Sequence, residues 1–543
     1  MNNDDLYVFS TRIIWLELNV PMYLVHQKFR GYFGDTNQNL SKQPAKAFLS
    51  DIVSKIQFKM LRRFKDNDTR IFLVKLFKIL DEVQHFYIRQ RKAREKLIEL
   101  NVSNEPITET FEKNRNIARN IIDSVNIWIE NCTLHENLCD SYEQNNKFEL
   151  DYDLLLDIYI YGLTSQALSL LSLSKIKSIG EYTGVAITPQ SDIPAEILRE
   201  HPIVYFNTLL TGNQNILTPV AINSEADSTN FGIAFKRTYN IEFLYFIAVI
   251  TYFQKFILHD GKYGLTEIDK QQFISEISYS TKPTIEPQSI IDSFTLTKDI
   301  VSSQLRKGDP VIWVMGTNKK RFELCPFILL DNDRVFISYC ALEQAKQLWV
   351  SFFSNGGMCY TNTEDDLTVA ISERNTELSN ELIHILREKL RSHYRPSFDE
   401  VDVDYSRIYG QREINYGDYD IVFYSAESKE LFLIEAKFMS DSLTNSGLIS
   451  DYDKMFGSGK YYNHCRRRYD LVLAEPELLK SFVGATGEIC VHLLFISSKP
   501  LEIEFQDEDG VVNFLCLSIF DKYLEGKLIN DDDDGVMRPT HKI

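Results

Sequence analysis

The chain has 543 residues, 44% of them hydrophobic and 25% charged, and this composition excludes an intrinsically disordered protein. The formal net charge of -18 repels polyanions, so nucleic acid would need a local basic patch, a bound metal ion or a partner in order to bind. The first residues lack the pattern of a secretory signal, and the most apolar window, 243–253, is too short for a membrane span. The eight cysteines form no C-x-x-C pair, which favours reduced thiols. We therefore expect a cytoplasmic protein of about two to four domains that does not bind a membrane.

Residues 1–305 are predicted to form a mainly helical region. Apolar residues recur at intervals of three and four in 45–64 and 69–101, and further helical patterns occupy 111–130 and 152–173. Glycine, proline and polar residues are frequent between 179 and 232, which indicates a long loop or an internal boundary near 180–232. No catalytic spacing occurs in this region.

Residues 306–370 are predicted to form a small antiparallel β meander followed by a helix. Segments 311–314, 322–330 and 335–339 have the composition of short strands, and 341–354 has a helical pattern that ends at Asn355-Gly356-Gly357.

Residues 371–529 are predicted to form an α/β domain. A helix from Ser372, its expected N-cap, to about His393 is followed by a strand at 398–408 and by a hairpin of 419–424 and 431–438. A mostly helical stretch at 452–481 and an apolar strand at 489–497 complete an α-β-β-β-α-β order. The acidic tail, 530–543, is expected to be disordered.

The hairpin brings charged residues together. If Tyr424 pairs with Leu431, Asp420 lies opposite Glu435 and Asp418 lies opposite Lys437, all on one face. Opposed residues have Cβ atoms about 4.5 to 5.5 Å apart. Two carboxylates that close repel each other by roughly 4 kcal/mol at an effective dielectric constant near 20. A divalent cation bound by their oxygens would relieve this repulsion better than one lysine can.

These residues resemble a known family. Asp420, a spacer and then Glu435-Ala436-Lys437 are similar to the acidic residue and E-x-K signature of the PD-(D/E)XK nuclease superfamily, and the resemblance covers about residues 370–500. It implies a restriction-endonuclease-like fold in which Asp420 and Glu435 bind Mg²⁺ or Mn²⁺ and Lys437 orients or activates the attacking water. Gly417-Asp418 replaces the nominal Pro-Asp, so Asp418 is a second candidate for the first ligand.

The helices around the hairpin supply further candidates. In the family the helix before the sheet often adds a glutamate ligand, which implies Glu377 or Glu381, although an acidic, solvated stripe is the alternative. After the hairpin, the candidates for holding the nucleic-acid backbone are Lys460, Arg466, Arg467 and Arg468, and a structural arginine cluster is the alternative. The glutamine that some relatives carry in this helix is absent.

The resulting hypothesis is a metal-dependent nuclease that hydrolyses phosphodiester bonds, in DNA more than in RNA. By analogy with bacterial antiviral defence effectors, the helical region would sense a signal or recruit a protein partner, and the chain could form a homo-oligomer. The alternative hypothesis is a non-catalytic scaffold or binding module that uses a degenerate nuclease fold.

Overall fold

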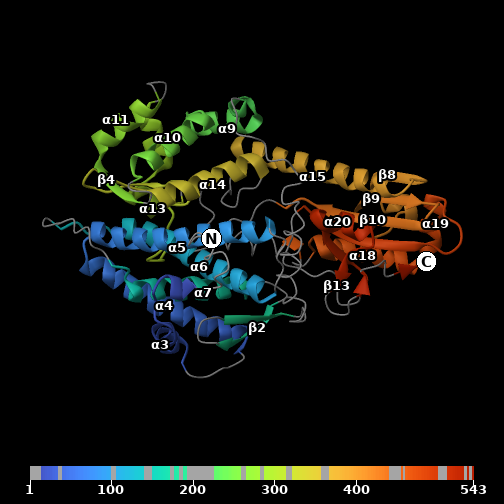
Figure 1. Cartoon of the computed structure of the whole chain (residues 1–543), viewed down its shortest axis with the longest axis horizontal. Coiled ribbons are helices and arrows are strands. Elements are labelled where there is room, and N and C mark those ends of the chain that lie inside the picture. The colour runs from blue at the N-terminus through green and yellow to red at the C-terminus, as the bar shows by residue number, and fades with distance from the viewer. Residues whose placement is uncertain are drawn as a thin grey trace.

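The computed structural model of the chain describes residues 14–34, 40–99, 105–139, 149–171, 176–182, 187–191, 225–258, 264–281, 286–312, 321–355, 366–439, 454–455, 459–498, 510–530, 535–536 and 541–543. A mainly helical part holds the amino-terminal residues and a sheet-containing part holds the carboxy-terminal ones (Figure 1). The long helix α15 (Asp366–His393) runs from the first part to the second.

The amino-terminal helices confirm the helical segments that the spacing of apolar residues predicts. They are α2 (Ile14–Glu17), α3 (Met22–Phe33), α4 (Lys42–Asp66), α5 (Thr69–Glu99), α6 (Glu105–Leu134) and α7 (Tyr152–Leu170). Helices α5 and α6 pack along each other, as do α4 and α7. A three-stranded sheet was not expected among them, and its strands are β1 (Leu40–Ser41), β2 (Ile176–Tyr182) and β3 (Ile187–Ser191).

A second layer of helices and strands covers this bundle. Its helices are η1 (Ala226–Ser228), α9 (Asn230–Tyr239), α10 (Phe243–Phe256), α11 (Lys270–Thr281), α12 (Pro287–Phe294), α13 (Lys298–Ser302) and α14 (Tyr339–Asn355). Its four-stranded sheet has the order β4 (Leu265–Asp269), β7 (Arg334–Ser338), β6 (Phe327–Leu329) and β5 (Thr295–Leu296). Strands β4 and β5 precede residue 306, and β6 and β7 follow it. One sheet therefore contains residues from both predicted regions, 1–305 and 306–370.

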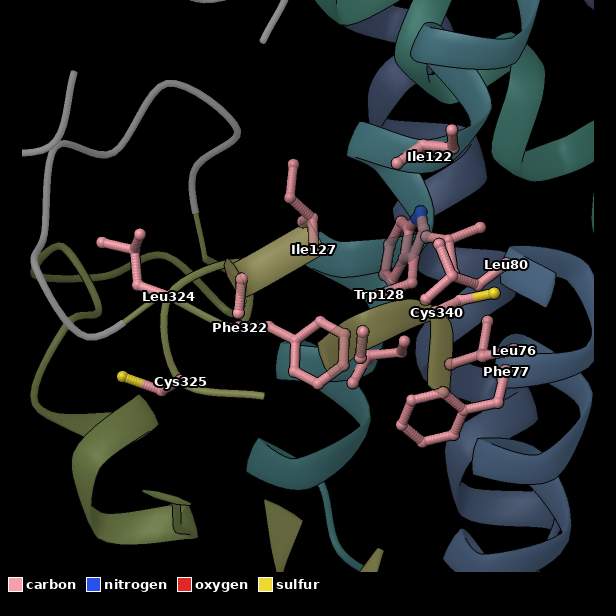
Figure 2. Close-up of a cluster of buried hydrophobic side chains, with 14 of the residues drawn as sticks. Leu76, Phe77, Leu80, Ile122, Ile127, Trp128, Phe322, Leu324, Cys325 and Cys340 are labelled. Atoms are coloured by element: carbon pink, nitrogen blue, oxygen red, sulfur yellow. The ribbon is translucent and has the colours of Figure 1, made fainter. Parts of the chain in front are cut away.

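The expected strand at 311–314 is wrong for its described residues. Val311 and Ile312 are buried but belong to no strand, and residues 313 and 314 lie outside the described residues. The Ile312 N–H donates instead to the Asn131 side chain on α6, at 2.8 Å. Segment 321–325 then packs against the bundle: the Phe322 ring meets Phe77 of α5 edge to face, near Trp128 of α6 (Figure 2). Docking on α6 has replaced strand pairing here.

Helix α15 begins at Asp366 and not at the predicted N-cap, Ser372. Leu367, Ala370 and Ile371 are buried in the hydrophobic cluster of the amino-terminal part, so the added turns bury apolar surface. Further along, Leu382, Leu386 and Leu390 pack on the carboxy-terminal sheet. Burial at both ends therefore makes α15 longer than its local capping signal predicts.

The carboxy-terminal sheet has the strand order β12-β11-β10-β9-β8. These strands are β8 (Phe398–Asp404), β9 (Asp418–Ser425), β10 (Glu430–Lys437), β11 (Cys490–Ser497) and β12 (Asn513–Cys516). Pairing is antiparallel among β8, β9 and β10 and parallel from β10 to β12. Together with α15 and α18 (Tyr461–Ala474), they contain the predicted α-β-β-β-α-β element order. The further helices are α16 (Ser406–Tyr409), α19 (Pro476–Val483) and α20 (Leu517–Leu524).

Both faces of this sheet are buried, as the apolar runs predict. Ile421, Phe423 and Ile434 pack with α15 and α20. Val422 and Leu433 pack on the opposite face with residues of α18 and α19. Charged groups at the ends of these strands are therefore close to a low-dielectric interior.

The prediction of a disordered tail is wrong for the tail residues that the structure describes. Strand β14 (Gly535–Val536) pairs with β13 (Ile529–Asn530), and β15 (His541–Lys542) pairs with the first two residues of β11. Among the described residues, β12 pairs with the second half of β11, and β15 pairs along the same edge with the first two residues of β11. No helix among the described residues is long and apolar enough to cross a membrane.

Candidate functional site

The hairpin has the predicted register. Tyr424 pairs with Leu431, and the pairing continues to Ile421 opposite Ile434. Regular backbone pairing ends there, one residue before Asp420 and Glu435. The Ala436 N–H instead donates to Oδ2 of Asp420, at 2.6 Å. The Asp420 carboxylate is therefore fixed by the backbone of the neighbouring strand.

Lys437 joins the two acids of the motif. Its Nζ lies 3.2 Å from Oδ2 of Asp420 and 2.7 Å from Oε1 of Glu435. The side chains are 21% exposed for Lys437, 13% for Asp420 and 6% for Glu435, so the three groups meet where the sheet core reaches solvent. The structure thus brings together the three residues predicted to be catalytic.

Asp402 on β8 is a further acidic residue that the sequence prediction missed. Val401 pairs with Ile421 and Val403 with Tyr419, which places Asp402 beside Asp420. One carboxylate oxygen each from Asp402, Asp418 and Asp420 lies within 4.8 Å of the other two. The alternation of acids in F-D-E-V-D-V-D, once paired with β9, is the signal that could have found it.

Asp402 has an unfavourable backbone and an unfavourable electrostatic environment. Its φ is 51°, in the left-handed region that non-glycine residues rarely adopt within a strand. Partial burial, followed by the negative charges of Asp420 and Asp418, raises the pKa of the Asp402 carboxyl, and Lys437 only partly opposes this. A bound cation would favour the charged form of all three aspartates.

Glu435 has a different set of partners. Its Oε2 is ion-paired with Nη2 of Arg468 on α18, and its Oε1 with Lys437. It is not part of the three-aspartate group, although Lys437 connects it to Asp420. Both carboxylate oxygens are therefore held by cations of the chain.

The remaining candidates are less closely connected with this group. Glu377 is largely exposed and pairs with Arg374 at 3.0 Å, and Glu381 is half-buried. Among the described residues, neither glutamate belongs to a cluster with the geometry of a metal site. Lys460 and Arg467 are exposed, and Arg466 pairs with Asp470. The buried Arg468 contacts Glu435 and so reaches the motif.

The donor set fits a divalent metal ion. Carboxylate oxygens are the ligands that Mg²⁺ and Mn²⁺ prefer. The group contains four carboxylates if Glu435 is included, and among the described residues their ion pairs involve only Lys437 and Arg468. Asp402, Asp418 and Asp420 are thus the residues best placed to hold an ion, with Glu435 adjacent.

Comparisons of the chain with models of protein families, with curated proteins and with solved structures found no significant match.

Proposed function

We propose that the protein is a Mg²⁺- or Mn²⁺-dependent nuclease of the PD-(D/E)XK type. The observation that carries the proposal is the meeting of Asp420, Glu435 and Lys437 at the ends of paired strands, next to two further aspartates. In the form that the sequence favours, the proposed nuclease is cytoplasmic and cuts DNA in preference to RNA.

A bound metal ion would polarise the scissile phosphate and lower the pKa of a coordinated water. The residues of the chain have separate tasks. Asp402, Asp418 and Asp420 would hold the ion through their oxygens. Lys437, which lies between Asp420 and Glu435, would orient the attacking water and stabilise negative charge as it develops.

The arrangement of α15 supports regulated or partner-dependent activity. One end of this helix is buried in the amino-terminal core and the other packs on the sheet. Near its end, Arg387 and Arg391 both bind Asp399 of β8, three residues before Asp402. A partner or signal that moves the amino-terminal part would therefore act on the strand that carries Asp402. We include in this proposal a role of the protein in antiviral defence and its assembly into a homo-oligomer.

Incubation of the purified protein with plasmid DNA, linear DNA and RNA, with and without Mg²⁺, tests the proposal. We expect Mg²⁺-dependent cleavage that falls at least about 100-fold in Asp420→Asn, Glu435→Gln and Lys437→Met. Asp404→Asn is the matched control, because Asp404 lies on β8 opposite Asp418 but its carboxylate accepts the Ser406 N–H.

The alternative function, a non-catalytic scaffold, predicts the opposite pattern. Nucleic acid or a protein would bind without being cleaved, and Glu435→Gln would leave binding unchanged. Cleavage that persists in Glu435→Gln at the wild-type rate would remove the nuclease assignment of this site.

A further inference from the structure

Arg468 differs from the other basic residues of α18 because its guanidinium is buried. Its side chain is 4% exposed, whereas Arg467 is exposed and Arg466 pairs with a residue of its own helix. Nη2 of Arg468 is paired with Glu435, whose side chain is 6% exposed. A phosphate backbone in solvent cannot easily reach a group so enclosed, so Arg468 is poorly placed to grip substrate.

The same guanidinium also holds the turn that leads into β9. Nη1 of Arg468 donates to the Tyr416 carbonyl oxygen, at 2.9 Å. The next residue, Gly417, has a φ of +77°, and a Cβ atom added there would lie 2.8 Å from Nη1. Glycine adopts this backbone conformation without strain, and a larger residue would require the guanidinium to shift. Arg468 therefore connects Glu435 of β10 with the turn immediately before Asp418.

Two contacts between Arg468 and Tyr419 hold α18 against β9. The guanidinium lies over the Tyr419 ring, 5.6 Å from its centroid, and the Tyr419 hydroxyl donates to the Arg468 carbonyl oxygen at 3.2 Å. Tyr419 stands between Asp418 and Asp420 in the sequence. Side chain and backbone of Arg468 thus both contact the segment that carries two of the three clustered aspartates.

The hydrogen bonding of Arg468 is incomplete for a structural arginine. Its Nε is buried and has no hydrogen-bond partner within the described part of the chain. Buried donors in proteins are almost always satisfied, so an unsatisfied one calls for an explanation, of which a functional role is one. The guanidinium is held by two acceptors that belong to two different parts of the site.

We propose that Arg468 is a positioning residue: it fixes Glu435 of β10 relative to residues 416–420, which form the turn before β9 and its first three residues, so that the carboxylates from both strands face one bound divalent ion. This inference rests on the proposed function, because it assumes that the group binds a metal ion. Partners that orient metal ligands typically change affinity by about 10- to 100-fold when they are removed.

The test measures Mn²⁺ affinity by calorimetry in the wild-type protein, Arg468→Met and Arg468→Lys, with a melting curve of each metal-free protein. We expect the Mn²⁺ dissociation constant to rise about 10- to 100-fold in Arg468→Met. In Arg468→Lys we expect a smaller rise, because the ammonium can still pair with Glu435 but cannot contact the Tyr416 carbonyl at the same time. Arg412→Met is the control, since Arg412 pairs with Glu475 outside the site.

The outcomes separate the two proposals. A wild-type protein without saturable Mn²⁺ binding overturns both the metal site and the role of Arg468. Saturable wild-type binding with an unchanged or lower dissociation constant in both Arg468 variants overturns only the role of Arg468. A lower melting temperature with unchanged Mn²⁺ affinity in these variants also overturns the role of Arg468, because Arg468 then contributes only to stability. If Arg468→Met does not fold, Arg468→Lys decides.

Discussion

Charged side chains cluster in both parts of the molecule, and two of these clusters differ in how far the chain itself balances their charge. Asp153 and Asp157 on α7 are ion-paired with three cations, Lys28, Lys59 and Arg63. In the carboxy-terminal site, four carboxylates meet two cations, Lys437 and Arg468. The first cluster is neutralised within the helix bundle, whereas the excess of carboxylates in the second supports our proposal that it binds an external cation.

The pKa shifts of the aspartates in the two clusters are opposite, in line with this difference in charge balance. Burial raises the pKa of Asp153, but hydrogen bonds from Lys28 and Lys59 outweigh it and lower that pKa to about 2. At Asp402, burial and the neighbouring aspartates together raise the pKa. One aspartate is stabilised in its charged form, and the other is destabilised.

Breaking a balanced, buried pair should have the largest effect on stability. Glu130 and Arg321 are 1% and 3% exposed and lie 2.9 Å apart, and the Phe322 N–H donates to the same carboxylate. Arg321→Met leaves the Glu130 charge without its partner, so we expect the free energy of unfolding in urea to fall by about 3 to 5 kcal/mol. Mn²⁺ affinity should not change in the folded variant. A loss below about 1 kcal/mol would contradict this reading of the pair.

Metal binding should produce the next largest effect, confined to the unbalanced site. At a Mg²⁺ concentration about 100-fold above the dissociation constant, we expect the free energy of unfolding to rise by about 2.7 kcal/mol. Thermal melting with and without Mg²⁺ measures this effect. Asp404→Asn should keep the increase and Asp418→Asn should lose most of it. An equal increase in both variants would place the ion elsewhere.

Neutralising Asp153 should destabilise the balanced cluster by about 1 kcal/mol at pH 7, since the residue is half-exposed. Its folded-state pKa is depressed, so its contribution is present above its ordinary pKa and is lost as the pH falls toward 2. Urea unfolding of Asp153→Asn and wild type between pH 7 and 3 tests this sign. A difference that grows on acidification would be inconsistent with the depressed pKa.

Neutralising Asp402 should have a smaller effect of opposite sign. Its folded-state pKa is raised, so this carboxyl makes the metal-free protein less stable as the pH rises above its ordinary pKa. Asparagine removes the charge and tolerates a positive φ. Because Asp402 is exposed and solvent screens the repulsion, we expect Asp402→Asn to raise the unfolding free energy by only about 0.5 kcal/mol at pH 7. The same variant should bind Mn²⁺ more weakly. Destabilisation of the metal-free protein would refute the repulsion that we infer.

The sequence predicts the hairpin and the proximity of Asp420, Glu435 and Lys437 because both depend on local rules. A polar turn between two apolar runs sets the register, and period two then brings Asp420 and Glu435 to the same end. Asp402 could not be placed in this way, since its position depends on the pairing of β8 with β9. Its left-handed backbone is visible only in the structure.

Residues whose roles depend on packing were the hardest to predict. Three adjacent arginines look alike in the sequence, yet the helix turns Arg468 inward to Glu435 and leaves Arg467 exposed. The start of α15 was misplaced because burial of Leu367 and Ile371 extends the helix beyond Ser372. Strand β15 was missed because an acidic tail gives no local sign of the edge on β11 that it covers.

Direct titration with Mn²⁺, followed by the electron paramagnetic resonance signal of the free ion, tests the central claim that the unbalanced carboxylates hold a divalent cation. The account predicts saturable binding to the wild-type protein and to Asp404→Asn, and loss of that binding in the double variant Asp418→Asn/Asp420→Asn. Equal binding to the wild-type protein and the double variant, or no saturable binding to the wild-type protein, would contradict it.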